Sequence, residues 1–156
     1  QQASLDEPYA RDAYAQAAGH QTAEAGLLVR DMDGYQIGYS PDGLIGDDGL
    51  VEIKSRLPKK HLAAVVADEV PAENIAQCQA ALLVSGRKWC DYVSFCGGMR
   101  LWIKRVYPDP RWRDAILTAT AATERAITET IAAYHAHTEG LPMTERPVYQ
   151  DLEIRL

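Results

Sequence analysis

The sequence has little of what several common protein classes need. Its 156 residues include only three cysteines and no apolar run near the roughly 20 residues that span a bilayer. Cys78, Cys90 and Cys96 do not form the close pairs of a zinc or cluster site, so we expect reduced, buried thiols. No stretch resembles a secretory leader, and the chain opens on Gln1 without a methionine, as a trimmed or partial chain would. A cytoplasmic setting without a membrane partner is therefore expected.

Other familiar catalytic patterns are also missing. No Ser-His-Asp nucleophile set stands out, and the glycines after Ser85 and at 97–98 indicate a helix stop and a turn rather than phosphate loops. His135 and His137 lie two positions apart on a predicted helix, where side chains diverge by about 200°, so they are poor joint metal ligands. The remaining candidates for chemistry are carboxylates and a lysine.

Length and composition fit one globular domain over residues 1–156, with 47% hydrophobic and 24% charged residues. The patterns predict helices over 6–18, 58–67, 71–85 and 112–137, and strands over 25–32, 35–40, 43–45, 50–55, 89–96 and 99–107. Residues 140–156 are expected to form an irregular tail. This order predicts an α/β fold in which helices flank a central mixed sheet on both faces.

Charge is unevenly distributed along the chain. The net charge is −6, yet residues 50–113 hold eleven basic and six acidic side chains. A basic middle can hold a polyanion although the whole chain is acidic. The candidate DNA-binding residues are Arg56, Lys59, Lys60, His61 and Arg87. The alternatives are scattered surface charge and, for His61, an ordinary surface histidine.

A predicted hairpin carries two acids and a lysine. Ser40–Leu44 reads Ser-Pro-Asp-Gly-Leu, and after an Asp-Asp-Gly turn the chain continues Leu-Val-Glu-Ile-Lys-Ser. Side chains alternate along a strand, so Glu52 and Lys54 share a face, and the hairpin brings Asp42 back towards Glu52. An acidic pair with an adjacent ammonium suits a hard divalent cation that activates water, as in a metal-dependent phosphodiesterase.

Each of these residues also has a simpler interpretation. Pro-Asp-Gly is a common turn signal, so Asp42 could be only a turn residue. Glu52 and Lys54 could lie on a solvated strand face. Gln77, on the helix that faces them, could hold the water or the lysine, or it could be a surface glutamine. Gln79, two positions on, would face differently.

Taken together, these segments resemble a known family. Asp42, Glu52 and Lys54 are similar to the D…ExK signature of the PD-(D/E)XK nuclease superfamily. Within it, the chain resembles the lambda-type exonucleases, also called the YqaJ-like viral recombinase domain. Further similar segments, in order, are His61–Ala63, Glu69–Glu73, the A-Q-x-Q stretch Ala76–Gln79, and Val84–Val93. The resemblance covers about residues 5–107.

The resemblance implies a restriction-endonuclease-like core and a Mg²⁺ site at which Mn²⁺ would substitute. Asp42, Glu52 and the Ile53 carbonyl would bind an ion, and Glu7, in the first helix, would serve a second ion; one ion and two ions both remain open. The family's usual segment before this helix, with an arginine for a terminal phosphate, has no counterpart here: either an N-terminal segment is lacking or the chain does without it.

Two further residues have catalytic roles by the same resemblance. Lys54 would position the attacking water and stabilise charge on the phosphorus, with base catalysis as the less favoured role. Gln77 would hold the water or the lysine. The iron–sulfur branch of the superfamily is disfavoured, because three scattered cysteines cannot hold its cluster.

The implied function is Mg²⁺-dependent exonuclease action on linear duplex DNA, from 5′ to 3′, in phage-type recombination. The implied partners are double-stranded DNA ends, other copies of the chain in a ring-shaped homotrimer, and a single-strand annealing protein. A bacterial host cell and a phage or prophage origin follow. A repair or restriction-type nuclease is a related alternative. A non-catalytic DNA-binding or assembly module that keeps the fold is the alternative from another class, and the intact triad Asp42, Glu52 and Lys54 disfavours it.

Overall fold

A computed structural model of the protein describes residues 2–146. The helices are α1 (Gln2–Ala18), α2 (Pro58–Ala67), α3 (Ala72–Ser85) and α4 (Pro110–Thr138), and the strands are β1 (Leu28–Asp31), β2 (Gln36–Tyr39), β3 (Gly43–Ile45), β4 (Gly49–Ser55), β5 (Trp89–Phe95) and β6 (Trp102–Val106). The predicted order is confirmed. The predicted start of the first helix at Asp6 is wrong, because α1 begins at Gln2. Proline is common in the first turn of a helix, so Pro8 favoured the later start, but it lies inside α1.

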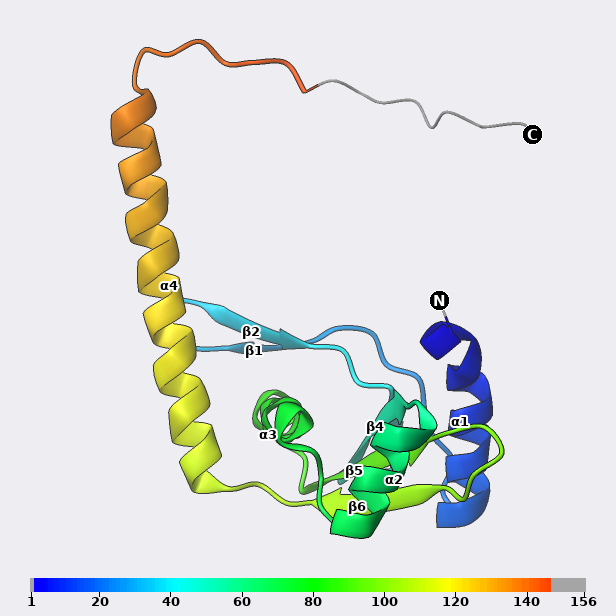
Figure 1. The fold of residues 1–156 in the computed structure, drawn as a ribbon. Coiled ribbons are helices and arrows are strands. Elements are labelled where there is room, and N and C mark those ends of the chain that lie inside the picture. The colour runs from blue at the N-terminus through cyan, green and yellow to red at the C-terminus, as the bar shows by residue number, and fades with distance from the viewer. Residues whose placement is uncertain (1, 147–156) are drawn as a thin grey trace, which may run out of the picture. The chain divides into compact units, whose positions relative to one another are not determined.

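Strands β3 to β6 form a mixed sheet in the order β3-β4-β5-β6 (Figure 1). β3 pairs antiparallel with β4, and β5 pairs antiparallel with β6. The central pair, β4 and β5, is parallel. Parallel neighbours need a crossover connection, which α2 and α3 provide. The catalytic candidates of β4 therefore lie in the middle of the sheet.

Helices cover both faces of this sheet, which confirms the predicted fold class. One core cluster joins α3 to the sheet and contains Tyr39, Leu50, Cys78, Ala81, Leu82, Val84, Cys90, Tyr92 and Val106. A second cluster joins α1 to the opposite face and contains Ala10, Tyr14, Ile45, Val51, Ile53 and Val93. Because strand side chains alternate, the even-numbered residues of β4 face α3 and the odd-numbered ones face α1.

β1 and β2 form a separate antiparallel two-stranded sheet, here called the ribbon (Figure 1). Its turn is closed by a 2.8 Å hydrogen bond from the Met32 N–H to the Tyr35 carbonyl. Gly34 in this turn has a φ of 84°, a conformation that glycine adopts without strain, so the predicted Asp-Gly turn is confirmed. Leu28 and Ile37 pack the ribbon against the core cluster on the α3 side.

The chain divides into two compact units, residues 1–122 and residues 123–156. In the second unit α4 continues to Thr138, and residues 141–146 have no regular structure, as expected for the tail. Residues 147–156 of that predicted tail lie outside the described residues. The three cysteines are free and buried. Within residues 2–146, no helix is both long enough and apolar enough to span a bilayer.

Candidate active site

β3 and β4 set two acidic side chains opposite each other. Gly43 pairs with Val51, so the antiparallel register, continued by one residue, places Asp42 opposite Glu52. Opposed residues of an antiparallel pair present their side chains on the same face. Asp42 Oδ2 also accepts a 2.6 Å hydrogen bond from the Ile53 N–H, which fixes the carboxylate against β4. The structure thus brings Asp42 and Glu52 together across the hairpin.

The Glu52 carboxylate is buried and contacted by three polar side chains. Lys54 Nζ and Gln77 Nε2 each lie 2.6 Å from Oε1, and the hydroxyl of Tyr39 donates to Oε2. Only 1% of Glu52 is exposed, whereas the Lys54 side chain keeps 28% of its surface accessible. Burying a carboxylate is costly unless the charge is paired and hydrogen-bonded, and here it is both. The lysine remains within reach of a solvent-borne substrate.

Asp42 carries an unfavourable charge at neutral pH. Burial, together with the nearby Glu52 carboxylate, raises the pKa of Asp42 to about 6. The Ile53 N–H and the Lys54 ammonium oppose this rise, whereas Glu7 adds to it. Several carboxylates around one lysine leave an excess of negative charge. A divalent cation would relieve that repulsion and favour the ionised acids.

Glu7 lies near this pair but is bound elsewhere. Its Oε1 accepts a 2.8 Å hydrogen bond from Arg11 one turn along α1, and its side chain is 42% exposed. Arg11 also binds Glu24 at 2.9 Å. Among the described residues, no three His, Cys, Asp or Glu side chains lie close enough together to hold one metal ion. The structure therefore does not group Glu7 with Asp42 and Glu52.

The pair formed by Asp42 and Glu52 still fits a hard cation by its chemistry. Two carboxylates supply the oxygen ligands that Mg²⁺ prefers, while waters and a substrate phosphate can complete its octahedron. Each carboxylate oxygen can accept two hydrogen bonds, so the contacts of Glu52 Oε2 with Tyr39 and of Asp42 Oδ2 with Ile53 leave lone pairs available. The N–H of Ile53, whose carbonyl is the predicted backbone ligand, contacts Asp42.

Gln77 and Gln79 leave α3 on different sides. Gln77 reaches Glu52 in the site. Gln79 instead donates to the Tyr107 carbonyl at 2.9 Å and accepts from the Asp109 N–H at 3.0 Å. It lines a cavity of about 530 Å³ between α3, β1 and the start of α4. Helical positions two apart diverge by about 200°, so this cavity lies on the side of α3 away from Glu52.

The basic residues after β4 differ in what they contact. Arg56 donates to Asn74 and, at 2.9 Å, to the hydroxyl of Tyr92, and its side chain is only 11% exposed. It therefore braces the end of β4 against α3. Lys59 and Lys60 are exposed in the first turn of α2, and neither has an ion pair among the described residues. These two lysines suit a phosphate contact better than Arg56 does.

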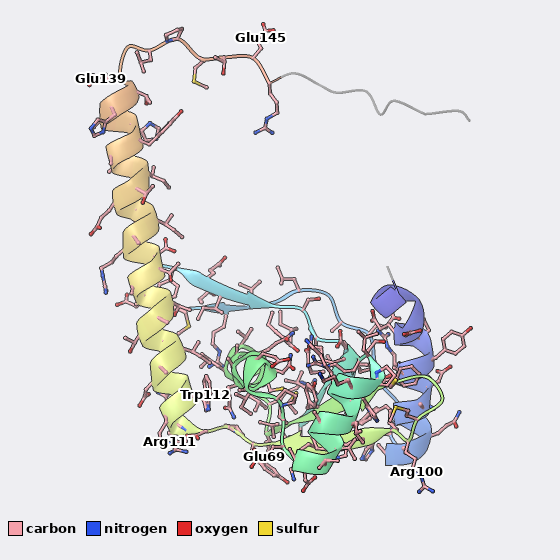
Figure 2. The ribbon with its side chains drawn as sticks, viewed as in Figure 1. Glu69, Arg100, Arg111, Trp112, Glu139 and Glu145 are labelled. Atoms are coloured by element: carbon pink, nitrogen blue, oxygen red, sulfur yellow. The ribbon has the colours of Figure 1, made fainter. Side chains whose placement is uncertain are left out.

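The expected surface position of His61 is wrong, and its burial disfavours the predicted DNA contact. His61 is 1% exposed, its Nδ1 lies 2.8 Å from Ser94 Oγ, and its Nε2 lies 3.0 Å from the Arg100 carbonyl. A carbonyl only accepts, so Nε2 carries the proton and Nδ1 accepts from the serine. The Arg100 carbonyl accepts the hydrogen bond from His61 Nε2. The Arg100 side chain itself is directed outward (Figure 2). Both imidazole nitrogens therefore hold α2 in place, one against β5 and the other against the loop between β5 and β6.

Arg87 supports the hairpin that carries the acids. Its Nη1 donates to the carbonyls of Gly46 at 2.7 Å and Gly49 at 2.8 Å, on the two sides of the β3–β4 turn. It also lines the cavity on the far side of α3. These contacts give Arg87 a structural role in the hairpin, so a DNA contact is not needed to explain an arginine at this position.

Tyr39 is a site residue that was not predicted, although its sequence context carries a signal. Ile37 and Tyr39 alternate with polar or small neighbours in β2, so both face the core. A tyrosine in such a position buries both its apolar ring and its hydroxyl, and the buried hydroxyl needs a hydrogen-bond partner. Burial, with a further contribution from Glu52, raises the pKa of Tyr39 far above its usual value, so the hydroxyl stays protonated and donates.

The comparisons with known proteins agree with this geometry. The model of the YqaJ-like viral recombinase domain matches residues 4–88, more than half of the chain. The chain belongs to this family. The resemblance drawn from the D…ExK segment and the motifs that follow it is therefore confirmed.

Solved structures extend the likeness beyond those residues. An alkaline exonuclease (LHK-Exo) from Laribacter hongkongensis matches with a TM-score of 0.83 and 29% identity over 91% of this chain and 75% of that one. The same enzyme in complex with dAMP matches with the same score and identity, over 91% and 74% of the two chains. SSO0001, at 14% identity and a TM-score of 0.53 over 76% and 56%, shares the fold alone. No curated protein matches. The fold is that of a nuclease, as predicted.

Proposed function

We propose that this YqaJ-family protein is a divalent-metal-dependent deoxyribonuclease that removes nucleotides from the ends of linear duplex DNA. The observation that carries the proposal is the opposition of Asp42 and Glu52 across one hairpin, with Lys54 beside them in the same partly buried site. Likeness to an alkaline exonuclease, which also has a structure with dAMP, supports hydrolysis of DNA with a nucleotide product.

Mg²⁺ is the proposed ion, and Mn²⁺ is expected to substitute. Asp42 and Glu52 would hold it through carboxylate oxygens, with the Ile53 carbonyl as a backbone ligand. Glu7 is the candidate for a second ion, which would require its pair with Arg11 to open. When bound, the ion supplies an activated water and stabilises negative charge on the phosphate.

Lys54 and Gln77 act around the attacking water. The Lys54 ammonium has three N–H donors, so beside its ion pair with Glu52 Oε1 it can still donate to a water or a phosphate oxygen. A fixed positive charge there stabilises the pentavalent phosphorus as its charge develops. Gln77 donates one amide N–H to Glu52, so its second N–H and its carbonyl oxygen can orient the water.

The finer parts of the proposal follow from the family. The proposed direction is 5′ to 3′ resection that leaves single strand for phage-type recombination. Lys59 and Lys60, exposed in the first turn of the helix that follows β4, suit contacts with the phosphate backbone of a duplex end. A ring-shaped homotrimer, a single-strand annealing partner and action in a bacterial host cell, with a phage or prophage origin, are proposed on the same ground.

Digestion of linear duplex DNA labelled at either end tests this function. The expected result is Mg²⁺-dependent release of nucleotides from the 5′ end, abolished by EDTA. Lys54→Ala should lower the rate at least ~100-fold while DNA binding persists, because it removes the positive charge at the reacting phosphate. Substrates with a 5′-phosphate and a 5′-hydroxyl would show which end the enzyme selects.

Lys88→Ala is the matched control. Lys88 is a 74% exposed lysine whose ion pair with Asp48 lies on the hairpin turn, so its loss should leave the rate unchanged. Full activity of Lys54→Ala would remove that lysine from the mechanism. A wild-type protein that binds duplex ends but never cleaves them with Mg²⁺ or Mn²⁺ would support the non-catalytic module instead.

A further inference from the structure

Tyr39 connects the ribbon to the Glu52 carboxylate. It is the last residue of β2, is 8% exposed, and donates its hydroxyl to Glu52 Oε2. Among the described strands, the ribbon and the four-stranded sheet that carries Glu52 form separate hydrogen-bonded sheets. The contact therefore joins two sheets through one side-chain pair.

The two oxygens of Glu52 are held from different elements. Lys54 and Gln77 both bind Oε1, at 2.6 Å each, and Tyr39 binds Oε2. The last torsion of a glutamate side chain has broad preferences, so donors on one oxygen alone leave the plane of the carboxylate free to rotate. A donor on each oxygen removes that freedom.

Packing in turn fixes the position of the Tyr39 hydroxyl. The ring belongs to the core cluster with Leu50 and Cys78, and Leu28 and Ile37 of the ribbon pack against the same cluster. Side chains in a close-packed core have little room to move. The hydroxyl is thus a fixed donor, whereas a long, flexible side chain would have to be ordered first.

We propose that Tyr39 is a positioning residue of this site and holds the Glu52 carboxylate in the orientation that binds the divalent cation. The proposal rests on the proposed function and deepens it. Contacts to the outer side of metal ligands typically change metal affinity or activity 10–100-fold when they are removed. The ribbon, which supplies no predicted ligand, becomes part of the active site through this residue.

The simpler alternative is that Tyr39 only satisfies its own buried hydroxyl. Tyr14 provides a control for this alternative within the same chain. Tyr14 is fully buried, and its hydroxyl donates to Asp91 Oδ2 at 2.8 Å on the opposite face of the sheet. Both tyrosines therefore make a buried phenol–carboxylate contact, but only one of the two carboxylates is a proposed ligand.

Tyr39→Phe and Tyr14→Phe separate the two interpretations. Both changes keep the ring and lose one hydroxyl, so both should lower the melting temperature. Only Tyr39→Phe should weaken Mg²⁺ binding, by about tenfold in titration calorimetry, and lower kcat on linear duplex by a similar factor with KM for DNA little changed. Tyr14→Phe should match the wild type in Mg²⁺ affinity and kcat.

Each outcome decides something definite. Equal Mg²⁺ affinity and kcat in Tyr39→Phe and the wild type would overturn the positioning role and leave the proposed function intact. Equal losses of Mg²⁺ affinity in both phenylalanine variants would also overturn it, because a general loss of stability would then explain them. A wild-type protein that shows neither Mg²⁺ binding in calorimetry nor cleavage of linear duplex DNA would overturn the proposed function itself.

Discussion

Two buried carboxylates, Glu52 and Asp91, lie on neighbouring strands but on opposite faces of the same sheet. Their exposures, 1% and 2%, are almost equal. Asp91, on the α1 side, receives two hydrogen bonds from Arg105, at 2.7 and 2.9 Å, and one from Tyr14 at 2.8 Å. Glu52, on the α3 side, receives one each from Gln77 and Tyr39 and forms an ion pair with Lys54. Each carboxylate thus has three polar contacts, and their number does not distinguish the two.

The balance of charge distinguishes them. Asp91 has a guanidinium of its own, which also stacks 3.7 Å from the centre of the Trp89 ring. Glu52 shares the single ammonium of Lys54 with Asp42, whose pKa is raised to about 6. A balanced buried pair serves the fold, whereas an unbalanced one attracts a cation. Burial of a carboxylate therefore indicates a functional site in this protein only where nearby positive charges do not balance the negative charge.

The largest expected difference between the two acids is in catalysis. Glu52→Gln removes a proposed ligand charge and should lower the rate of DNA hydrolysis at least ~100-fold. Asp91→Asn should keep the rate per folded molecule within about twofold, because Asp91 faces α1 and not the proposed site. Single-turnover digestion at saturating Mg²⁺, well below both melting temperatures, measures this. A comparable loss in Asp91→Asn would break the distinction between the faces.

Stability should show the reverse order. Asp91→Asn leaves Arg105 without its charged partner, and we expect the free energy of unfolding to fall by roughly 2 kcal/mol, less than for a fully buried pair because the arginine side chain is 39% exposed. Glu52→Gln relieves repulsion with Asp42 and should cost less than Asp91→Asn. Urea unfolding in EDTA measures both. A greater loss for Glu52→Gln would mean that its donors already balance its charge.

The smallest expected effect concerns Asp42. Its raised pKa means that the folded protein holds this proton more tightly than the unfolded chain does. The contribution of Asp42 to stability is therefore greatest below its ordinary pKa of 3.8 and is lost as the pH rises through about 6. Asp42→Asn should therefore stabilise the protein in EDTA at pH 7, by about 1 kcal/mol after allowance for partial solvent screening, and hardly at pH 4.

Asp48→Asn is the matched control for that measurement. Asp48 is an exposed acid of the same hairpin, and its ion pair with Lys88 lies at the surface, so its replacement should change stability little at either pH. A stabilisation of Asp42→Asn that is the same at pH 4 and pH 7 would contradict the charge repulsion. Added Mg²⁺ should reverse the order by stabilising the wild type more than Asp42→Asn.

The hairpin half of the site could be predicted because its geometry is local. A turn signal between two short strands and the alternation of side chains were enough to bring Asp42, Glu52 and Lys54 to one face. Gln77 could be placed because its helix, α3, leads into β5, so the chain must cross back over the sheet before that strand. These relations depend on the order of residues along the chain, which the sequence contains.

The remaining contacts depend on how separate elements dock. Tyr39 reaches Glu52 only because the ribbon packs on α3, and no local pattern encodes that packing. His61 follows two exposed lysines, so its burial could not be read locally; its partners, Ser94 and Arg100, lie 33 and 39 residues away. A sequence read by segments therefore finds the ligands of this site more readily than the side chains that support them.

The short turn between β3 and β4 constrains how this protein can diverge. Ile45 pairs with Gly49, and Arg87 holds the carbonyls on both sides of the turn. Because side chains alternate with a period of two, a change of length here that shifts the strand register by one residue would turn one acid to the opposite side of the sheet. We therefore expect relatives to tolerate many substitutions in this turn but very few changes of its length.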